Sequence, residues 1–422
     1  MTVTVTEAHR TIDAVWRIES AKLIAALVRV VRDVGLAEEL AQDALVAALE
    51  QWPSSGVPSN PGAWLMTIAK RRAIDHFRHQ KMAQRKHEEV ALDLDTTQEA
   101  IEVEPDEVPD DLLRLIFTAC HPVLPTQSRV ALTLRLLGGL STEEVARAFL
   151  VPEATVAQRI VRAKRTLATT KVPYEVPVGD ELSDRLGSVL EVVYLIFNEG
   201  YSATAGEDWM RPALCADAIR LGRILAGLAP REPEVFGLVA LMELQASRAR
   251  ARVTPEGEPI RLMDQNRAKW DRLLIGHGLA ALARAEELSA EPGPYTLQAA
   301  IAACHARAGA PEDTDWPRIA ALYGELARVT PSPVVELNRA VAVSMAAGPE
   351  AALPLVDALG AEPALSRYHL LPTVRGDLLA RVGRFAEAET EFTRAAELTR
   401  NERERAVLHA KAAEAAARAS TP

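Results

Sequence analysis

The stretch STEEVARAFLVPEATVAQRIVRAKRTL, residues 141–167, predicts two short helices joined at a tight turn. Ser141 and Glu144 have the spacing of a capping box, in which each side chain accepts a hydrogen bond from the other residue's backbone N–H. Pro152 ends the first helix because proline has no N–H to continue the helical hydrogen bonds. Val145 and Phe149 then face inward, so the stretch predicts a helical hairpin.

The second helix of this hairpin has two different faces. Val156, Ile160, Ala163 and Leu167 form an apolar stripe, while Ala154, Gln158, Arg162 and Arg165 lie opposite, with Thr155 beside them. A helix that enters the major groove of DNA needs such a face, because small residues allow close approach and Gln and Arg can hydrogen-bond to base edges. A surface hairpin with a solvated basic face fits the same pattern, so the pattern alone leaves both interpretations open.

Composition and charge set the context for that hairpin. The chain has 422 residues, too many for one small domain, and its 48% hydrophobic and 5% aromatic content favours an all-α fold. The net charge of −10 hides a marked asymmetry. Residues 70–86 hold seven Lys and Arg against one acid, residues 88–111 hold eleven acids and no base, and residues 154–171 hold five bases and no acid. Two basic patches flanking an acidic segment favour a polyanionic partner.

Several classes of protein are disfavoured by the sequence. It has no apolar run long enough to span a bilayer, no signal-peptide pattern at its start, and three cysteines, Cys120, Cys215 and Cys304, outside any C-x-x-C pair. We therefore expect a cytoplasmic protein whose cysteines are small core residues. Phosphate-loop, metal-ligand and nucleophile-elbow spacings are missing, so we expect no enzyme, no cofactor, no catalytic residue and no metal site.

The chain is expected to have three helical parts. The stretch RGDLLARVGRFAEAETEFTRAAEL, residues 375–398, has the small-residue spacing of a tetratricopeptide unit, with Gly376 in its first helix and Phe392 in its second. A generic helical array is the alternative. The expected parts are helical residues 8–87, an acidic linker at 88–111, a compact helical unit at 112–171, a second linker at 172–181 and a helical-repeat extension at 182–422.

Three segments together resemble one known family. They are GLAEELAQDALVAALEQW (35–52), NPGAWLMTIAKRRAIDHFR (60–78) and RVALTLRLLGGLSTEEVARAFLVPEATVAQRIVRAKRTL (129–167). Their order and spacing resemble the extracytoplasmic-function (ECF) sigma factors of the sigma-70 class. The segments VPYEVP (172–177), VVYLIFNEGYSA (192–203), EDTDWPRIAALY (312–323) and SPVVELNRAVAV (332–343) resemble the sub-group with a long tetratricopeptide-like extension at its C-terminus.

The resemblance implies roles for particular residues. Residues 8–87 would form sigma region 2, which docks on the clamp coiled coil of the β′ subunit of RNA polymerase through Glu39, Gln42 and Asp43. It would read the −10 element through Lys70, Arg71, Arg72, Asp75 and Arg78, although the family often has Asn where this chain has Arg71. Residues 112–171 would form region 4, which meets the β flap and reads the −35 element with Thr155, Gln158 and Arg162 on base edges and Arg159, Lys164 and Arg165 on phosphates.

Two functions therefore remain to be compared. The first is a sigma factor controlled in cis by its extension, which would also offer a surface to a protein or peptide partner. The second is a helix-turn-helix regulator with a tetratricopeptide-like sensor that acts without docking on polymerase. The second function uses only residues 112–171 for DNA and leaves residues 36–87 unexplained.

Overall fold

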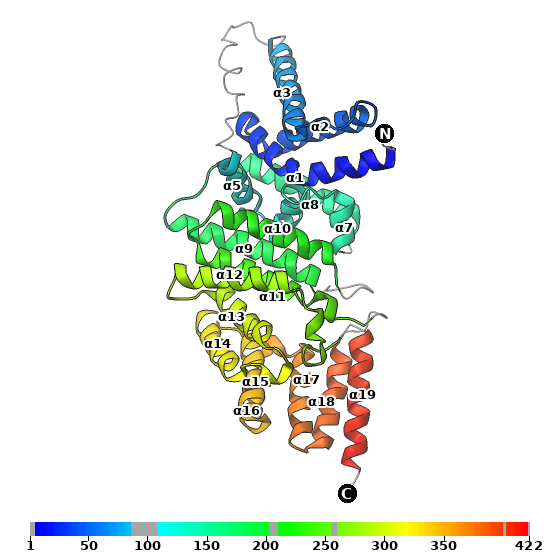
Figure 1. The fold of residues 1–422 in the computed structure, drawn as a ribbon, viewed down its shortest axis with the longest axis vertical. Helices are drawn as coiled ribbons and strands as arrows, with labels where there is room; N and C mark the ends of the chain where they lie inside the picture. Colours follow the sequence, from blue (N-terminus) through cyan, green and yellow to red (C-terminus); the bar gives the residue numbers. More distant parts are fainter. Residues whose placement is uncertain are drawn as a thin grey trace. The chain divides into compact units, whose positions relative to one another are not determined.

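The computed structural model describes residues 5–85, 108–149, 151–201, 210–254, 260–399 and 402–420. These ranges contain the α-helices α1–α3 and α5–α19, short 3-10 helices and no strand, which confirms the all-α prediction (Figure 1). No helix in these ranges has the length and apolarity needed to cross a membrane. The predicted acidic linker lies outside the described residues except for 108–111, where α5 begins.

The chain divides into two compact units. The first unit comprises residues 1–200 and 213–228, and the second comprises residues 201–212 and 229–422. The predicted domain boundaries stay predictions, but the division places α9 and α10 of the expected extension in the first unit.

The first unit contains two helical modules followed by two further helices. The first module is α1 (Val5–Val31), α2 (Val34–Ser55) and α3 (Pro61–Arg85), and the second module is α5 (Val108–Ala119), α6 (Thr126–Leu136), α7 (Thr142–Phe149) and α8 (Glu153–Thr170). α9 (Asp180–Tyr201) and α10 (Pro212–Leu228) follow. Helix α1 packs against α2 and α3 within its own module and also against α5, so α1 contacts both modules.

The helical hairpin of α7 and α8 forms as its sequence predicts. The N–H of Ser141 donates to Oε2 of Glu144 at 2.7 Å, and the N–H of Glu144 donates to the Ser141 hydroxyl at 3.1 Å. The stripe of Val156, Ile160, Ala163 and Leu167 is buried. The capping box and the inward face of α8 are therefore confirmed.

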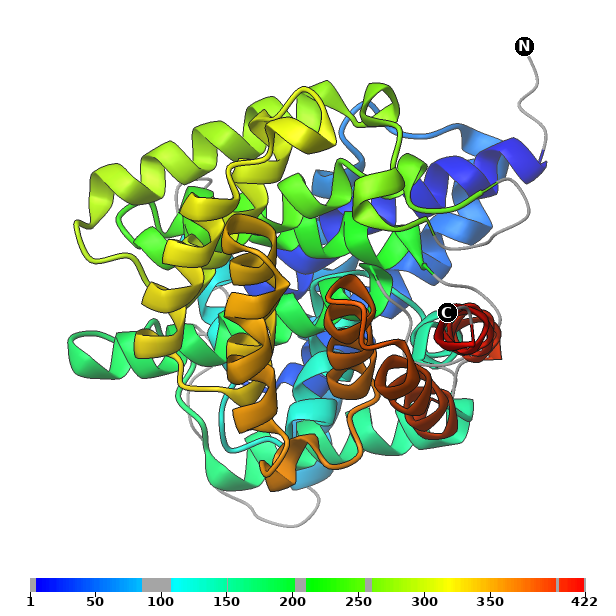
Figure 2. The same cartoon turned by 90° about the horizontal axis from the view of Figure 1, so that it is seen from below.

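The second unit is a chain of helices in which each helix packs against its neighbours in sequence (Figures 1 and 2). Its α-helices are α11 (Pro233–Ala246), α12 (Arg272–Leu288), α13 (Pro294–Arg307), α14 (Trp316–Val329), α15 (Pro333–Ala347), α16 (Pro349–Leu359), α17 (Leu370–Arg381), α18 (Phe385–Leu398) and α19 (Glu402–Ala419). Such neighbour-to-neighbour packing is typical of helical repeats.

Gly376 and Phe392 take the places that the repeat pattern predicts. They lie on the paired helices α17 and α18, and a Cβ added to Gly376 would stand 2.8 Å from Cε1 of Phe392. Phe392 is buried in the core of this end of the unit. A side chain at position 376 would therefore force the two helices apart.

Candidate nucleic-acid interface

The outer face of α8 presents three of the six residues predicted to contact the −35 element. Gln158, Arg162 and Arg165 are exposed, and Thr155 is half-buried beside them. The buried apolar stripe on the other side of α8 fixes which face is free. Amide and guanidinium donors on one exposed face are suited to base edges and phosphates of duplex DNA.

The other two predicted contacts, Arg159 and Lys164, point toward the protein. Arg159 is half-buried and lines a cavity of about 460 Å³ that Phe149, Leu195 and Glu199 also line. The Lys164 side chain is 21% exposed and its ammonium is paired with Oε2 of Glu38 in α2. In this arrangement neither side chain is presented beside Gln158 and Arg162.

Glu38 joins the two modules of the first unit. It is 3% exposed, and its Oε1 accepts hydrogen bonds from Nε of Arg135 at 2.6 Å and from Nε2 of Gln42 at 2.5 Å. A buried carboxylate is costly unless it is paired and hydrogen-bonded, and here two cations from the second module meet that need. Helices α2, α6 and α8 are therefore tied together at one carboxylate.

A second contact joins the modules beside the capping box. The Arg17 guanidinium of α1 lies 2.9 Å from Oε1 of Glu144, the same residue that caps α7. The turn before α7 contains Gly139 at φ +71°, and a Cβ there would lie 3.1 Å from the Ser20 hydroxyl and 3.4 Å from Cα of Arg17. Glycine permits both the left-handed backbone and this close approach.

A third contact lies where the segment between α8 and α9 crosses the first module. The Tyr174 hydroxyl is 2.9 Å from the backbone oxygens of both Ala25 and Asp111. The Asp111 carboxylate is fully buried between Arg29, at 3.4 Å, and Arg114, at 2.7 Å. Burial raises the pKa of Asp111 while the two guanidinium groups oppose that rise. Burial also raises the pKa of Tyr174, so its hydroxyl stays a hydrogen-bond donor.

Helix α3 carries the predicted −10 contacts on its outer side. Arg71, Arg72, Asp75 and Arg78 are exposed, whereas Lys70 is half-buried. The start of the helix is anchored by Trp64, whose ring meets the buried Trp52 edge-on at 5.3 Å between centroids. Trp64 therefore packs against the module core, and the cations beyond it form a basic surface suited to a phosphate backbone.

The predicted polymerase-docking residues lie along α2. Glu39 and Asp43 are exposed, while Gln42 is half-buried because its amide donates to Glu38. The residues of α2 that we predict to dock on polymerase thus lie within about one helical turn of the Glu38 carboxylate.

Sequence reasoning missed a polar network that links α9 to the second module. Nη2 of Arg185 donates to the Phe117 carbonyl at 2.9 Å, and the Ser188 hydroxyl donates to the Cys120 carbonyl at 2.5 Å. Arg129 of α6 in turn donates to Ser188 and, at 3.0 Å, to Oε2 of Glu191. Arg185, Ser188 and Arg129 are all buried. The signal in the sequence was a pair of polar residues, 185 and 188, one helical turn apart on an otherwise apolar face.

Three parts of the chain match known protein families. Residues 18–82 match the sigma-70 region 2 family, residues 114–167 match the sigma-70 region 4 family, and residues 185–286 match a family of unknown function, DUF6596.

The relatives of the chain fall into two groups. An uncharacterized protein of Rhizobium meliloti (strain 1021) is 46% identical over 386 residues, which covers 91% of this chain and 90% of that protein. The ECF RNA polymerase sigma factor SigK of Mycobacterium sp. (strain KMS) is 32% identical over 142 residues, which covers 31% of this chain and 68% of SigK. The crystal structure of yeast Tom70 aligns with 99% of this chain and with 86% of the Tom70 chain, at a TM-score of 0.38 and 11% sequence identity.

Proposed function

The chain belongs to the ECF sigma factors of the sigma-70 class, and from that premise we propose how its helices divide the work of promoter recognition. Helix α8 reads the −35 element, and α3 holds the −10 element. Helix α2 docks on the clamp coiled coil of the β′ subunit, and the second module meets the β flap. The protein acts in the cytoplasm, and its extension controls it in cis.

The observation that carries the proposal is the free face of α8. Gln158, Arg162 and Arg165 are exposed on the side opposite the buried stripe, as a helix in the major groove requires. The basic surface of α3 supplies the second contact that promoter recognition needs, and an ordinary helix-turn-helix regulator would have no use for it.

We further propose that this arrangement of the first unit is closed and must open on the promoter. The −10 and −35 elements are separated by about 25 base pairs, or about 85 Å of duplex. Helix α8 contacts α2 in the structure, and Lys164 is held by Glu38. The two readers therefore cannot reach both elements until the contacts around Glu38 and Glu144 separate.

Control by the extension is supported by the contacts of α9 and α10 with the second module. Arg185 and Ser188 donate to the carbonyls of Phe117 in α5 and of Cys120 just after it. The Arg220 guanidinium of α10 donates to the carbonyls of Leu137 and Gly138 at 3.2 and 3.1 Å. These hydrogen bonds hold the first two helices of the extension, α9 and α10, against the second module. A shift of α9 or α10 would therefore move the turn that precedes the hairpin.

The test is transcription in vitro with bacterial core polymerase on a promoter library. The full-length protein should give specific transcripts that core polymerase alone does not give. Arg162→Ala should weaken them by about 10- to 100-fold, since one good base contact is worth about 1–3 kcal/mol. Arg147→Ala is the matched control, because this exposed arginine of α7 pairs with Glu143 and lies outside the predicted face.

Two outcomes would contradict the proposal. Equal loss in Arg162→Ala and Arg147→Ala would show that α8 does not read the promoter. The helix-turn-helix regulator would be favoured instead by two observations together. The free protein would bind promoters specifically and equally well without core polymerase, and it would not bind core polymerase.

A further inference from the structure

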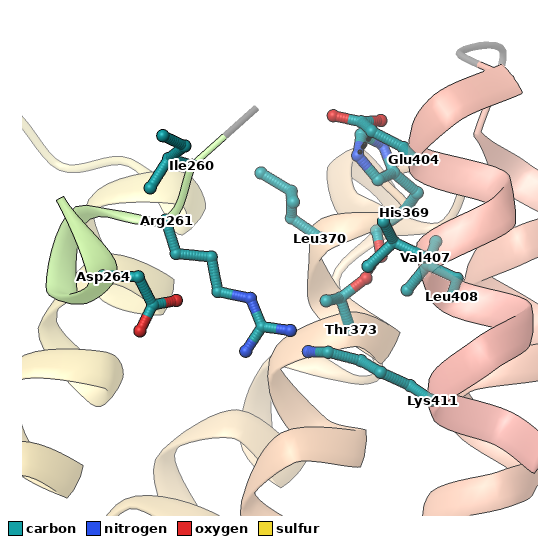
Figure 3. Close-up of a pocket in the computed structure, with 10 residues that line it drawn as sticks. All are labelled: Ile260, Arg261, Asp264, His369, Leu370, Thr373, Glu404, Val407, Leu408 and Lys411. Carbon is teal, nitrogen blue, oxygen red and sulfur yellow. Dashed lines mark hydrogen bonds and ion pairs between the residues drawn. The ribbon is translucent and has the colours of Figure 1, made fainter. Parts of the chain in front are cut away.

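The second unit contains a cavity that the promoter-reading role does not use. Its volume is about 640 Å³, which lies within the range of small-molecule sites. It is bounded on one side by the segment around the 3-10 helix η3 (Leu262–Asp264) and on the other by α17 and α19 (Figure 3).

One part of the cavity wall is apolar. Ile260, Leu370, Val407 and Leu408 line it, and two of them are large apolar residues with unusual exposure, Leu370 at 38% and Val407 at 42%. Leu370 and Val407 come from different helices and both border the same hollow. Exposed apolar side chains that gather around a cavity mark a place where apolar material can be buried.

Two cations extend into the cavity from opposite walls. Figure 3 shows the Arg261 guanidinium, from the residue before η3, and the Lys411 ammonium, from α19, pointing toward each other. The Lys411 ammonium donates to both oxygens of the Asp377 carboxylate, at 2.6 and 2.8 Å. The Arg261 guanidinium has no hydrogen bond or ion pair within the described residues. Because Lys411 is already paired with Asp377, the Arg261 guanidinium is the cation without a counter-ion among the described residues, and an anion bound to it would also lie near the Lys411 ammonium.

Three acids lie in or beside the cavity, and two of them, Glu404 and Asp377, are bonded to other residues. The Glu404 carboxylate accepts from the Thr399 hydroxyl at 2.8 Å and lies 3.2 Å from Nε2 of His369. Asp377 holds Lys411, and Asp264 is exposed on the η3 side without a bond to Arg261 (Figure 3). Glu404 thus lies at the other end of the cavity from the two converging cations.

We propose that this cavity binds a small amphiphilic anion, with a carboxylate or phosphate between Arg261 and Lys411 and an apolar body against Leu370 and Val407. Thr373 lines the same cavity. Its hydroxyl donates to the His369 carbonyl at 2.8 Å, so the hydroxyl oxygen is left as a hydrogen-bond acceptor in the cavity wall. This site concerns the second unit alone, and binding to it is measured without polymerase or DNA.

The test is calorimetric titration of the full-length protein with matched eight-carbon probes. Octyl phosphate and octanoate carry the two candidate anionic groups on the same kind of apolar chain. The probe that binds with the lower Kd identifies the preferred head group. Octanol, octylamine and inorganic phosphate each lack one half of the recognition. We expect one-to-one binding of at least one amphiphilic anion with a Kd on the order of 0.1 mM or lower, and at least tenfold weaker binding of the three partial probes.

Variants then assign the binding to this cavity. Arg261→Ala should weaken it by about tenfold or more, because a charge-assisted hydrogen bond is lost, and Arg261→Lys should restore part of the affinity. Leu370→Asn should weaken it independently through the apolar wall. Arg272→Ala, an exposed arginine at the start of α12 outside the cavity, is the control and should bind as the parent does.

Three results would overturn the proposal. The first is that neither amphiphilic anion binds saturably. The second is that octanol or octylamine binds as tightly as the anions do. The third is that Arg261→Ala keeps the parent affinity while its circular dichroism shows a folded protein.

Discussion

Oε1 of Glu38 accepts a hydrogen bond from Nε of Arg135 at 2.6 Å, between residues 97 positions apart in sequence. The other oxygen of the same carboxylate is paired with Lys164 of α8. One buried acid of the first module therefore holds two cations of the second module, including one that we expect on DNA. This relationship makes Glu38 the residue whose removal should open the first unit.

Glu38→Gln should separate the two modules. The substitution keeps the shape but leaves two cations without their acid, which should weaken the contact by about 1–3 kcal/mol because Arg135 and Lys164 remain partly hydrated. Energy transfer between dyes on α3 and α8 should report a longer distance. Promoter binding with core polymerase should be tighter than for the parent protein.

Glu50→Gln is the control for this opening, since Glu50 is an exposed acid of the same helix α2. It should leave the dye distance unchanged. If Glu38→Gln kept the parent distance, the contact around Glu38 would not be what holds the modules together.

Arg185→Met should uncouple α9 from the second module. Arg185 is 6% exposed and supplies the hydrogen bond to the Phe117 carbonyl, so its loss should cost about 1–3 kcal/mol in the free energy of unfolding. Urea unfolding gives that number, and amide exchange should speed up in α5. Transcription should change in the same variant if the extension controls the DNA-reading module.

Glu191→Gln is the matched change at the exposed end of the same network, where the carboxylate is 49% exposed and faces Arg129. An exposed ion pair contributes less than about 1 kcal/mol. A loss from Glu191→Gln as large as that from Arg185→Met would mean that the buried bond has no special role.

Gly376→Ala and Gly324→Ala should have effects of opposite sign. A Cβ at position 376 would press on the buried ring of Phe392 at 2.8 Å, so the first change should destabilise the second unit by about 1–3 kcal/mol. A Cβ at position 324, within α14, would meet nothing within 4 Å. The second change should stabilise by about 0.5–1 kcal/mol because alanine loses less conformational freedom in a helix than glycine does. Urea unfolding of both variants checks the pair, and equal signs would contradict the close approach of α17 and α18.

Stability should fall as the pH drops from about 6.5 to about 4 because of His305. Its imidazole is 8% exposed, and burial together with the nearby Arg248 and Arg267 lowers its pKa from 6.5 to about 4. Between these values the unfolded chain binds the proton and the folded chain does not, so protonation favours unfolding. The loss should reach about 3 kcal/mol at most and should level off below the folded pKa.

His305→Phe should remove this part of the pH dependence. Phenylalanine keeps an aromatic ring for the edge-on contact with Trp316, which the imidazole makes at 5.2 Å between centroids. Urea unfolding at pH 7.5 and pH 4.5 gives the difference for parent and variant. The same difference in both proteins would rule out His305 as its source.

The sequence by itself determined the local structure and the family. The buried stripe of α8 follows from spacing, because a helix puts residues three and four apart on one face. The capping box of Ser141 and Glu144 and the close pair of Gly376 and Phe392 follow from motifs with fixed spacing, one at the start of a helix and one in a pair of helices. The structure confirms the predicted burial of Cys120 and Cys304, whereas the same prediction is wrong for Cys215, which is half-buried. The family was indicated by the resemblance of three separated segments, and the matches to sigma-70 regions 2 and 4 agree with it.

The tertiary structure decided which partner each face meets. Arg162 and Lys164 look alike in sequence, yet one is exposed and the other is bound to Glu38 more than a hundred residues earlier. The link of α9 to α5 and the meeting of Arg261 with Lys411 are of the same kind. Helical periodicity tells which side of a helix is buried, but an ion pair or a cavity wall between distant residues depends on how whole helices pack, and no local pattern specifies that packing.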